Sequence, residues 1–273
     1  MWDSSLLPQC CWARARRAAC ITACASVLLF PALVLAQTLP TTSIDFASLA
    51  AALQGRDRDP ADFMRDASRR PLEVLEFLEL RRGMRVLDLY AAGGYYTFIL
   101  AKAVGPEGEV IAQNTKRGRA FVEDRQVMSQ GEALDAKTKP LNNVSQLIAS
   151  TTALGLPPES VDFILLAQTL HDYYNPNPQR ARALLQTLYT LLKPGGTLGI
   201  TDHIGDPRFD NSALHRMLPQ QALELALEAG FSVTQSDLLK VASDEPSRAI
   251  FDPRLARNTS RFLLRLRKPV ASN

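Results

Sequence analysis

The feature that most constrains the fold is an alternation of short apolar runs with amphipathic stretches, which begins at residue 84. Runs typical of buried strands are followed by segments with helical periodicity and turn residues. The expected strands span 84–90, 108–114, 144–150, 161–170 and 197–204, and the expected helices span 95–105, 116–137 and 178–192. Strands separated by helices predict an α/β fold, a doubly wound and mostly parallel sheet with helices on both faces.

The last part of the chain has a different pattern. Pro219 favours a helix that extends to Ala229, and apolar runs at 231–239 and 259–269 predict two strands joined by a long loop. We therefore expect a C-terminal antiparallel hairpin. Arginines alternate with apolar residues in the final run, which is typical of the outer region of a sheet. The "LLKPGG" stretch at 191–196 predicts a turn before the fifth strand.

Residues 37–83 precede the alternating pattern and form an expected N-terminal helical segment. Helical patterns cover 45–54 and 71–80, the second beginning at Pro71. The densely charged stretch between them, residues 55–70, is either a solvated connection or a lid over a site, and we favour the connection. With 84–273 as the main domain, the chain reads as one large domain and its extensions.

The first 36 residues are typical of a secretory signal peptide. A basic stretch with Arg14, Arg16 and Arg17 is followed by the apolar run 18–36, and Val-Leu-Ala at its end predicts cleavage after Ala36. An uncleaved anchor is the alternative, because the run approaches the ~20 apolar residues that span a bilayer. We expect a periplasmic or secreted protein without stable membrane association after cleavage.

Composition excludes several kinds of site in the expected mature chain. All four cysteines lie at positions 10, 11, 20 and 24, so cleavage would leave no disulfide, thiolate nucleophile or cysteine metal site. The net charge of +3 falls to about +1 without the leader. This balance does not indicate a nucleic-acid surface. A small molecule is the expected partner, and the oligomeric state stays open.

Four stretches carry a resemblance to a known family. They are "VLDLYAAGGYYT" at 86–97, "LPPESVDFILLAQTLHD" at 156–172, "LLKPGGTLGITDH" at 191–203 and "GF" at 230–231. In this order and spacing the chain resembles the class I S-adenosylmethionine-dependent methyltransferases over residues 71–268. It looks most like an exported bacterial branch with "GGYYT", "AQN" and "HD" in these places. The resemblance implies a Rossmann-like fold and S-adenosyl-L-methionine as cofactor.

The glycine turn after the first strand supplies the first expected cofactor contacts. Asp88 ends that strand, where a carboxylate can accept hydrogen bonds from an ammonium group or orient the amides of the turn. Gly93 and Gly94 allow positive φ and close backbone approach. Tyr90 and Ala92 stand where such turns usually have glycine, so Tyr90 either lies outward or stacks on the ligand.

Two further cofactor positions carry uncharged side chains. Asn114 ends the second strand, near the spacing at which related folds place an acid on the ribose hydroxyls. Its amide can accept one hydroxyl bond and donate another, without the stronger charge-assisted bond. Thr152 stands near the place where an acidic residue often meets the adenine amino group. Both residues predict weak or altered cofactor binding.

Two His/Asp pairs follow neighbouring strands of the predicted sheet. His171-Asp172 follows the fourth strand and Asp202-His203 ends the fifth, so all four side chains are expected at one crevice. As catalysts, either histidine removes a proton while an aspartate orients it. As ligands, the four side chains offer donors for a divalent metal, and as structure they cap loops. We rank base catalysis first and predict no metal.

The sequence as a whole predicts a methyltransferase that acts on an oxygen or nitrogen of a small molecule, with His171 or His203 as base. The alternative is an exported protein of this fold that no longer methylates and binds another ligand or a divalent metal through its His/Asp crevice. His215-Arg216, before the helix at Pro219, is expected to be a surface pair rather than an anion contact.

Overall fold

A computed structural model describes residues 42–123 and 126–270. The expected signal peptide, with its cleavage point after Ala36, lies outside these residues. None of the helices in the described part of the chain is both long and apolar enough to cross a bilayer.

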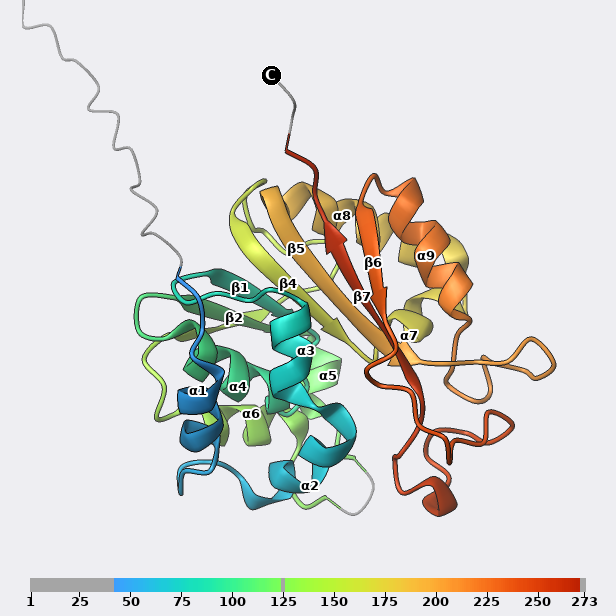
Figure 1. Cartoon of the computed structure of the whole chain (residues 1–273), viewed down its shortest axis with the longest axis horizontal. Helices are drawn as coiled ribbons and strands as arrows, with labels where there is room; N and C mark the ends of the chain where they lie inside the picture. Colours follow the sequence, from blue (N-terminus) through green and yellow to red (C-terminus); the bar gives the residue numbers. More distant parts are fainter. Residues whose placement is uncertain (1–41, 124–125, 271–273) are drawn as a thin grey trace, which may run out of the picture. The chain divides into compact units, whose positions relative to one another are not determined.

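Seven strands form one mixed sheet in the order β3-β2-β1-β4-β5-β7-β6 (Figure 1). Strands β1 to β5 are mutually parallel, and β7 runs antiparallel to both β5 and β6. The strands are β1 (Arg85–Leu89), β2 (Glu109–Asn114), β3 (Val144–Ile148), β4 (Val161–Ala167), β5 (Leu192–His203), β6 (Ser232–Ser236) and β7 (Arg261–Arg267). This order confirms the predicted α/β fold with a C-terminal antiparallel hairpin.

Helices pack on both faces of the sheet, and β4 shows why. Phe163 and Leu165 point into one apolar cluster with α3 and α4, whereas Ile164 and Leu166 point into another with α8 and α9. Successive side chains of a strand face opposite sides, so an unbroken apolar run requires cover on both. The helices are α1 (Phe46–Leu53), α2 (Pro60–Arg69), α3 (Pro71–Phe77), α4 (Tyr95–Val104), α5 (Lys116–Ala120), α6 (Gln130–Thr138), α7 (Leu170–Tyr174), α8 (Pro178–Leu191), α9 (Pro219–Glu228) and the 3-10 helix η1 (Pro253–Leu255).

The position of β7 differs from the prediction, because this strand lies between β5 and β6 and not at the outer region of the sheet. Its alternating arginines indicated exposure, but each has a partner inside the protein. Arg265 and Arg267 both bond to the carboxylate of Glu79, and Arg261 is buried with a bond to the carbonyl of Ser68. Because each arginine has a bonding partner within the protein, these charged side chains are compatible with a strand that has a neighbour on both sides.

Two local predictions were also wrong. The helical stretch expected at 116–137 is split into α5 and α6, and α6 begins at a capping box made by Ser129 and Glu132. The turn expected at 191–196 is largely part of β5, which begins at Leu192. The amide of Gly195 donates to the carbonyl of Lys268, and the amide of Lys268 donates to Gly196. These bonds extend the ladder with the end of β7 through the glycine pair.

The charged stretch at 55–70 is not a solvated connection. It contains α2, whose Asp62 is buried and pairs with Lys137 of α6 at 2.9 Å. The buried Arg58 pairs with Asp66 at 2.6 Å. At the end of α2, Arg69 donates to the side chain of Gln168, just after β4, at 3.3 Å. The segment thus contacts the residue that follows β4, at the carboxyl end of that strand.

Candidate active site at the carboxyl ends of the strands

The turn between β1 and α4 has three residues in the left-handed region. Tyr90 has φ 60°, Ala92 has φ 50° and Gly94 has φ 83°. The sequence suggested that Tyr90 and Ala92 remove glycine-like freedom, but both adopt this conformation here. Such a conformation is costly for residues with a Cβ, and it persists only where neighbouring structure holds it.

The last two residues of β2 hold the turn. The amide of Tyr90 donates to the side-chain oxygen of Gln113 at 3.0 Å, and the amide of Ala91 donates to the Gln113 carbonyl at 2.8 Å. Asn114 accepts from the amide of Ala92 at 3.0 Å and donates to the Ala92 carbonyl at 3.1 Å. Asn114 is 1% exposed, so both ends of its amide are used inside the protein. Sequence reasoning assigned it to a ribose and did not identify Gln113.

Asp88 is buried directly below this turn. It accepts a hydrogen bond from Thr97 at 2.6 Å. Burial raises the pKa of the Asp88 carboxyl to about 7, against the opposing effects of that bond and the positive charge of Arg69. Thr97 belongs to the first turn of α4, so its bond places the Asp88 carboxylate at the start of this helix. Among the described residues, no side chain caps the first amides of α4, which follow Gly94.

Arg69 was not identified from the sequence, and it occupies a central position at the carboxyl ends of the strands. Its guanidinium stacks over Tyr95 at 4.4 Å and near Tyr96 at 5.7 Å from the ring centroids. Both tyrosines are buried. The charge of Arg69 affects Asp88 on one side and His203 on the other. This cation therefore acts electrostatically on both the Asp88 carboxyl and the His203 imidazole.

Thr152 is not drawn toward the turn. It is exposed and its hydroxyl lies 2.8 Å from that of Ser150. Its neighbour Thr151 is buried and its hydroxyl is 2.9 Å from that of Tyr173.

The ring of Tyr90 lies close to Gly118, where an added Cβ would be 3.3 Å from the phenol oxygen. Tyr90 thus packs over Gly118 of α5, the helix that follows β2.

His171 and Asp202 form a buried dyad that joins the ends of β4 and β5. The Nδ1 atom of His171 lies 2.8 Å from Oδ1 of Asp202, and the backbone amide of His171 donates to Oδ2 at 2.8 Å. Burial opposes the charged imidazole, but Asp202 and Asp172 outweigh it and raise the pKa of His171 to about 10. His171 is therefore an imidazolium at neutral pH, which weakens the prediction that it acts as base.

His203 has the opposite character. It is buried at the end of β5, and its Nδ1 lies 2.7 Å from the hydroxyl of Thr259. Burial, together with the cations Arg261 and His171, lowers the pKa of His203 well below its usual value. The rings of His203 and His171 lie 6.2 Å apart. The sequence correctly predicted that both His/Asp pairs meet, and the structure separates them into one charged and one neutral imidazole.

His215 joins this group, although the sequence treated it as part of a surface pair. Its ring lies 5.6 Å from that of His171, and its Nδ1 lies 3.7 Å from Oδ1 of Asp172. All three histidines of the chain therefore converge. The only sequence signal was its position after the fifth strand, on a loop whose path the local pattern does not specify.

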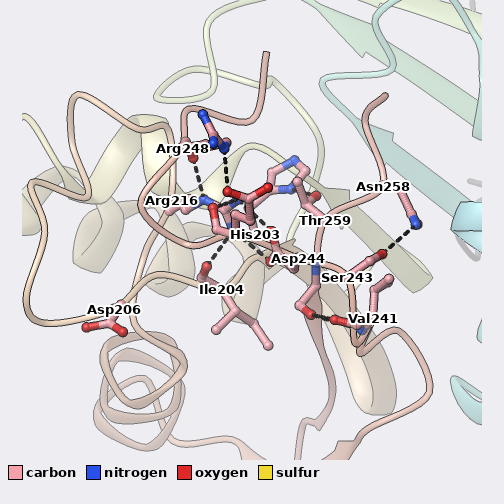
Figure 2. Close-up of polar contacts among 12 residues, drawn as sticks. His203, Ile204, Asp206, Arg216, Val241, Ser243, Asp244, Arg248, Asn258 and Thr259 are labelled. Carbon is pink, nitrogen blue, oxygen red and sulfur yellow. Dashed lines mark hydrogen bonds and ion pairs between the residues drawn. The ribbon is translucent and has the colours of Figure 1, made fainter. Parts of the chain in front are cut away.

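Arg216, the other member of the expected surface pair, is fully buried. Figure 2 shows its guanidinium bonded to both oxygens of Asp244, at 2.9 and 2.8 Å, and to the carbonyls of Ile204 and Arg248. The same view shows Thr259 beside His203. The Arg216–Asp244 ion pair thus joins the loop that carries His215 to the loop between β6 and β7.

The residues at the carboxyl ends fit the amino-acid part of S-adenosylmethionine. Asp88 can accept from an ammonium group, and the uncapped amides of α4 with the Arg69 cation suit a carboxylate. The ribose end is different, because the Asn114 amide already bonds twice to Ala92. A ribose would have to share or replace these bonds.

Comparison with known proteins agrees with this fold. A methyltransferase-domain family model matches residues 80–240. Demethylmenaquinone methyltransferases from Listeria monocytogenes and Geobacillus kaustophilus are 25% identical over 130 residues and 26% identical over 124 residues. These matches cover 48% and 45% of this chain and 49% and 47% of the relatives, so the chain spans about half the length of the curated proteins it matches.

Solved structures show the same architecture. A SAM-dependent methyltransferase from Aquifex aeolicus has a TM-score of 0.55 and 21% identity, and the match covers 83% of this chain and all of that one. The [4+2]-cyclase SpnF also has a TM-score of 0.55, at 20% identity over 75% of this chain and 82% of its own. At these identities the likeness concerns the fold alone, and a cyclase among the neighbours illustrates that chemistry must be argued from the site.

Proposed function

We propose, because this chain belongs to the class I S-adenosylmethionine-dependent methyltransferase family, that it transfers a methyl group to an oxygen or nitrogen atom of a small molecule. S-adenosylmethionine is the cofactor that the family implies, and when bound it supplies an electrophilic methyl group. The observation that carries the proposal is the meeting of two sets of groups at one edge of the sheet. Asp88 and the first turn of α4 lie at the end of β1, and the histidines lie at the ends of β4 and β5.

The cofactor side of the proposal assigns binding roles to this chain's own groups. The carboxylate of Asp88 would hold the ammonium group, and the amides of α4 with Arg69 would hold the carboxylate. An ammonium beside Asp88 favours the ionised form of a carboxyl whose pKa burial raises to about 7. Binding should therefore release a proton from the protein near neutral pH.

The acceptor side assigns proton removal to His203. His171 is held as an imidazolium by two carboxylates, whereas His203 is neutral and its Nδ1 is fixed by Thr259 at 2.7 Å. A neutral imidazole can accept a proton from a hydroxyl or amine. Most of the rate would come from positioning the acceptor in line with the methyl group.

The names of the curated relatives refer to a quinone substrate, which guides the choice of acceptors to test. We would follow S-adenosylhomocysteine formation by the full chain with panels of phenols, quinols and amines. The His203→Gln variant should lose at least about tenfold in kcat on any active acceptor, as typical for loss of a general base. A His171→Gln variant separately measures the contribution of the charged imidazole at the same site. Unchanged turnover in His203→Gln would remove His203 from the mechanism.

A second candidate function is a protein of this fold that binds a different ligand without methylating. The supporting observation is Asn114, whose amide is used by the turn and not presented to a ribose. S-adenosylhomocysteine that binds no better than adenosine alone would favour this candidate over the first.

We further propose that residues 1–36 are removed on export and that the mature protein is periplasmic or secreted, in the exported branch of the family. The support is the basic, apolar and small-residue pattern of the leader. Mass measurement of the amino terminus after cell fractionation tests this. A chain that begins at Gln37 outside the cytoplasm is expected, and an intact Met1 in the cytosol would contradict it.

A further inference from the structure

We infer that His171, Asp172 and His215 form a binding site for a divalent metal of the zinc type. Three potential ligand atoms converge here: Nε2 of His171, a carboxylate oxygen of Asp172 and Nδ1 of His215. They all lie within 4.8 Å of one another. The site was not anticipated as such, because the sequence grouped His171 and Asp172 with Asp202 and His203 and left His215 on the surface.

The spacing of these atoms suits tetrahedral coordination. Oδ1 of Asp172 lies 3.3 Å from Nε2 of His171 and 3.7 Å from Nδ1 of His215. With metal bonds of about 2.0–2.1 Å, the ligand atoms of a tetrahedral site lie about 3.4 Å apart. Octahedral ligands at similar bond lengths lie only about 3.0 Å apart. The two distances favour zinc over magnesium, and two imidazoles with one carboxylate favour it chemically as well.

The orientation of His171 is the second observation that points to a metal. Its Nδ1 lies 2.8 Å from Oδ1 of the fully buried Asp202. A hydrogen bond from Nδ1 to a carboxylate leaves Nε2 as the metal-binding atom. Here Nε2 faces Asp172, and a bound zinc ion would replace the proton that Nε2 carries in the imidazolium. Metal-bound histidines commonly donate their other ring N–H to a carboxylate in this way, which fixes the tautomer and raises the basicity of the ligand.

His215 is held in place by a buried ion pair at its neighbour in the chain and by an aromatic contact of its own ring. Its neighbour Arg216 forms the buried pair with Asp244. The His215 ring packs edge-on against Phe251 at 4.9 Å between centroids. The side chain thus has a defined position although it is 43% exposed. A ligand supplied by a distant loop would otherwise lose entropy on binding, and these contacts reduce that loss.

The exposure of the three side chains indicates a site that is open on one side. His171 is 4% exposed, whereas Asp172 is 54% and His215 is 43% exposed. Three protein ligands and a solvent-facing side leave a fourth position for water or another ligand, as in catalytic zinc sites. If the proposed function holds, on which this step alone rests, that position can take the acceptor oxygen or nitrogen and lower its pKa before His203 removes the proton.

Zinc titration of the metal-stripped full chain tests the site. The four cysteines, at 10, 11, 20 and 24, would compete for zinc, so Cys→Ser substitutions at all four are made in every sample. Calorimetry should give one zinc ion per chain with a dissociation constant of about 1 µM or lower. Cobalt(II) in place of zinc should give the visible absorption of a tetrahedral site.

Variants separate this site from adventitious binding. His215→Ala and Asp172→Asn should each weaken zinc binding at least tenfold, and both positions are exposed enough that the fold should survive, which circular dichroism checks. Asp210→Asn is the matched control, because it removes a carboxylate from the same loop outside the site, and it should bind as the parent does. Equal affinity in His215→Ala and the parent, or no binding tighter than millimolar, would overturn the site.

These measurements do not use S-adenosylmethionine or an acceptor, so they can fail or succeed independently of the proposed methyl transfer. If zinc binds as expected and no acceptor is methylated, the metal site stands without the proposed function. If methyl transfer occurs equally in zinc-free and zinc-loaded protein, the site is retained but its role in activating the acceptor is discarded.

Discussion

At the ends of β1 and β2, buried amide side chains bond to the backbone of a turn, whereas at the ends of β4 and β5 buried side chains bond to one another. Asn114 uses both ends of its amide on Ala92. His171 instead lies between the carboxylates of Asp202 and Asp172. The first arrangement is uncharged and shapes the backbone, and the second concentrates charge at one place.

This difference bears on function. Side chains that bond to the backbone of the turn have few hydrogen-bonding atoms left for a ligand. The end of β2 therefore serves mainly to hold Tyr90 and Ala92 in the left-handed region. At the ends of β4 and β5, paired carboxylates raise the pKa of His171, whereas burial and nearby cations lower the pKa of His203. Perturbed pKa values concentrate at functional sites. Proton removal should therefore reside on the β4 and β5 side, whereas the raised pKa of Asp88 at the end of β1 belongs to the cofactor side.

The largest expected effect comes from the ion pair that supports the histidine side. Arg216→Met leaves Asp244 buried without its partner and should lower the free energy of unfolding by about 3–5 kcal/mol, measured by urea denaturation. Arg208→Met in the same loop is the control, because that guanidinium is 77% exposed in its pair with Asp206. Its effect should stay within about 1 kcal/mol. Similar losses in both variants would contradict a special role for the buried pair.

Asp88 provides a pH test of the cofactor side. Its folded pKa of about 7 is raised above the unfolded value of 3.8, so the folded state binds the extra proton between these pH values. This contribution to stability is complete below pH 3.8 and is lost as the pH rises through 7. Asp88→Asn has no carboxyl at this position, so its stability does not show this loss. The free energy of unfolding of the variant minus that of the parent should therefore increase by about 3 kcal/mol between pH 4 and pH 8.

Urea denaturation at both pH values measures this change. The control is Asp57→Asn, because the bond from Lys102 lowers the pKa of the Asp57 carboxyl. Its stability should change with pH in the opposite direction and by a smaller amount, since Asp57 is largely exposed. An Asp88→Asn variant whose difference from the parent is the same at pH 4 and pH 8 would show that Asp88 is not buried as described.

Asn114→Asp should have a smaller effect, and it distinguishes a turn-holding role from a ribose-binding one. The carboxylate cannot donate to the Ala92 carbonyl, and it would be a buried charge at a 1% exposed position. We expect a loss of about 1–3 kcal/mol in thermal or urea unfolding, without tighter binding of S-adenosylmethionine. Asn258→Asp, at a half-buried position, is the control. A stable variant with higher cofactor affinity would show that the position serves the ribose after all.

The smallest expected effect concerns an ion pair between the loop that joins β6 to β7 and the segment between α5 and α6. Arg257 pairs with Glu123 at 2.6 Å, but the two side chains are 53% and 31% exposed. Arg257→Ala should change the free energy of unfolding by less than about 1 kcal/mol, as is usual for surface ion pairs. Urea unfolding measures it, and a loss near that of Arg216→Met would erase the contrast between exposed and buried pairs.

The sequence predicted the parallel part of the sheet, because unbroken apolar runs such as that of β4 require cover on both faces. It misplaced β7, because alternating arginines indicate exposure locally, and Glu79, which pairs with Arg265 and Arg267, is distant in the chain. It also treated residues 116–137 as one helix, because helical periodicity does not show where Ser129 begins a new one.

At the site, sequence reasoning brought both His/Asp pairs together through strand order alone. The sequence did not reveal which partners each of these side chains would bond to. The side chain of Asn114 bonds to the backbone of Ala92. Arg69, at the end of α2, bonds to Gln168 at the end of β4. His215 lies on a loop that the ion pair of Arg216 holds in position. Each of these depends on contacts between segments far apart in the chain, and local periodicity carries no information on them.

The central claim is that the altered turn remains a cofactor-binding element, and calorimetric titration of the full chain with S-adenosylmethionine and S-adenosylhomocysteine tests it most directly. We predict binding near micromolar, about −8 kcal/mol, with proton release near pH 7 and at least about tenfold weaker binding in Arg69→Ala. No binding at millimolar concentrations of either compound would contradict the claim, and the histidine side would then have to serve a different ligand.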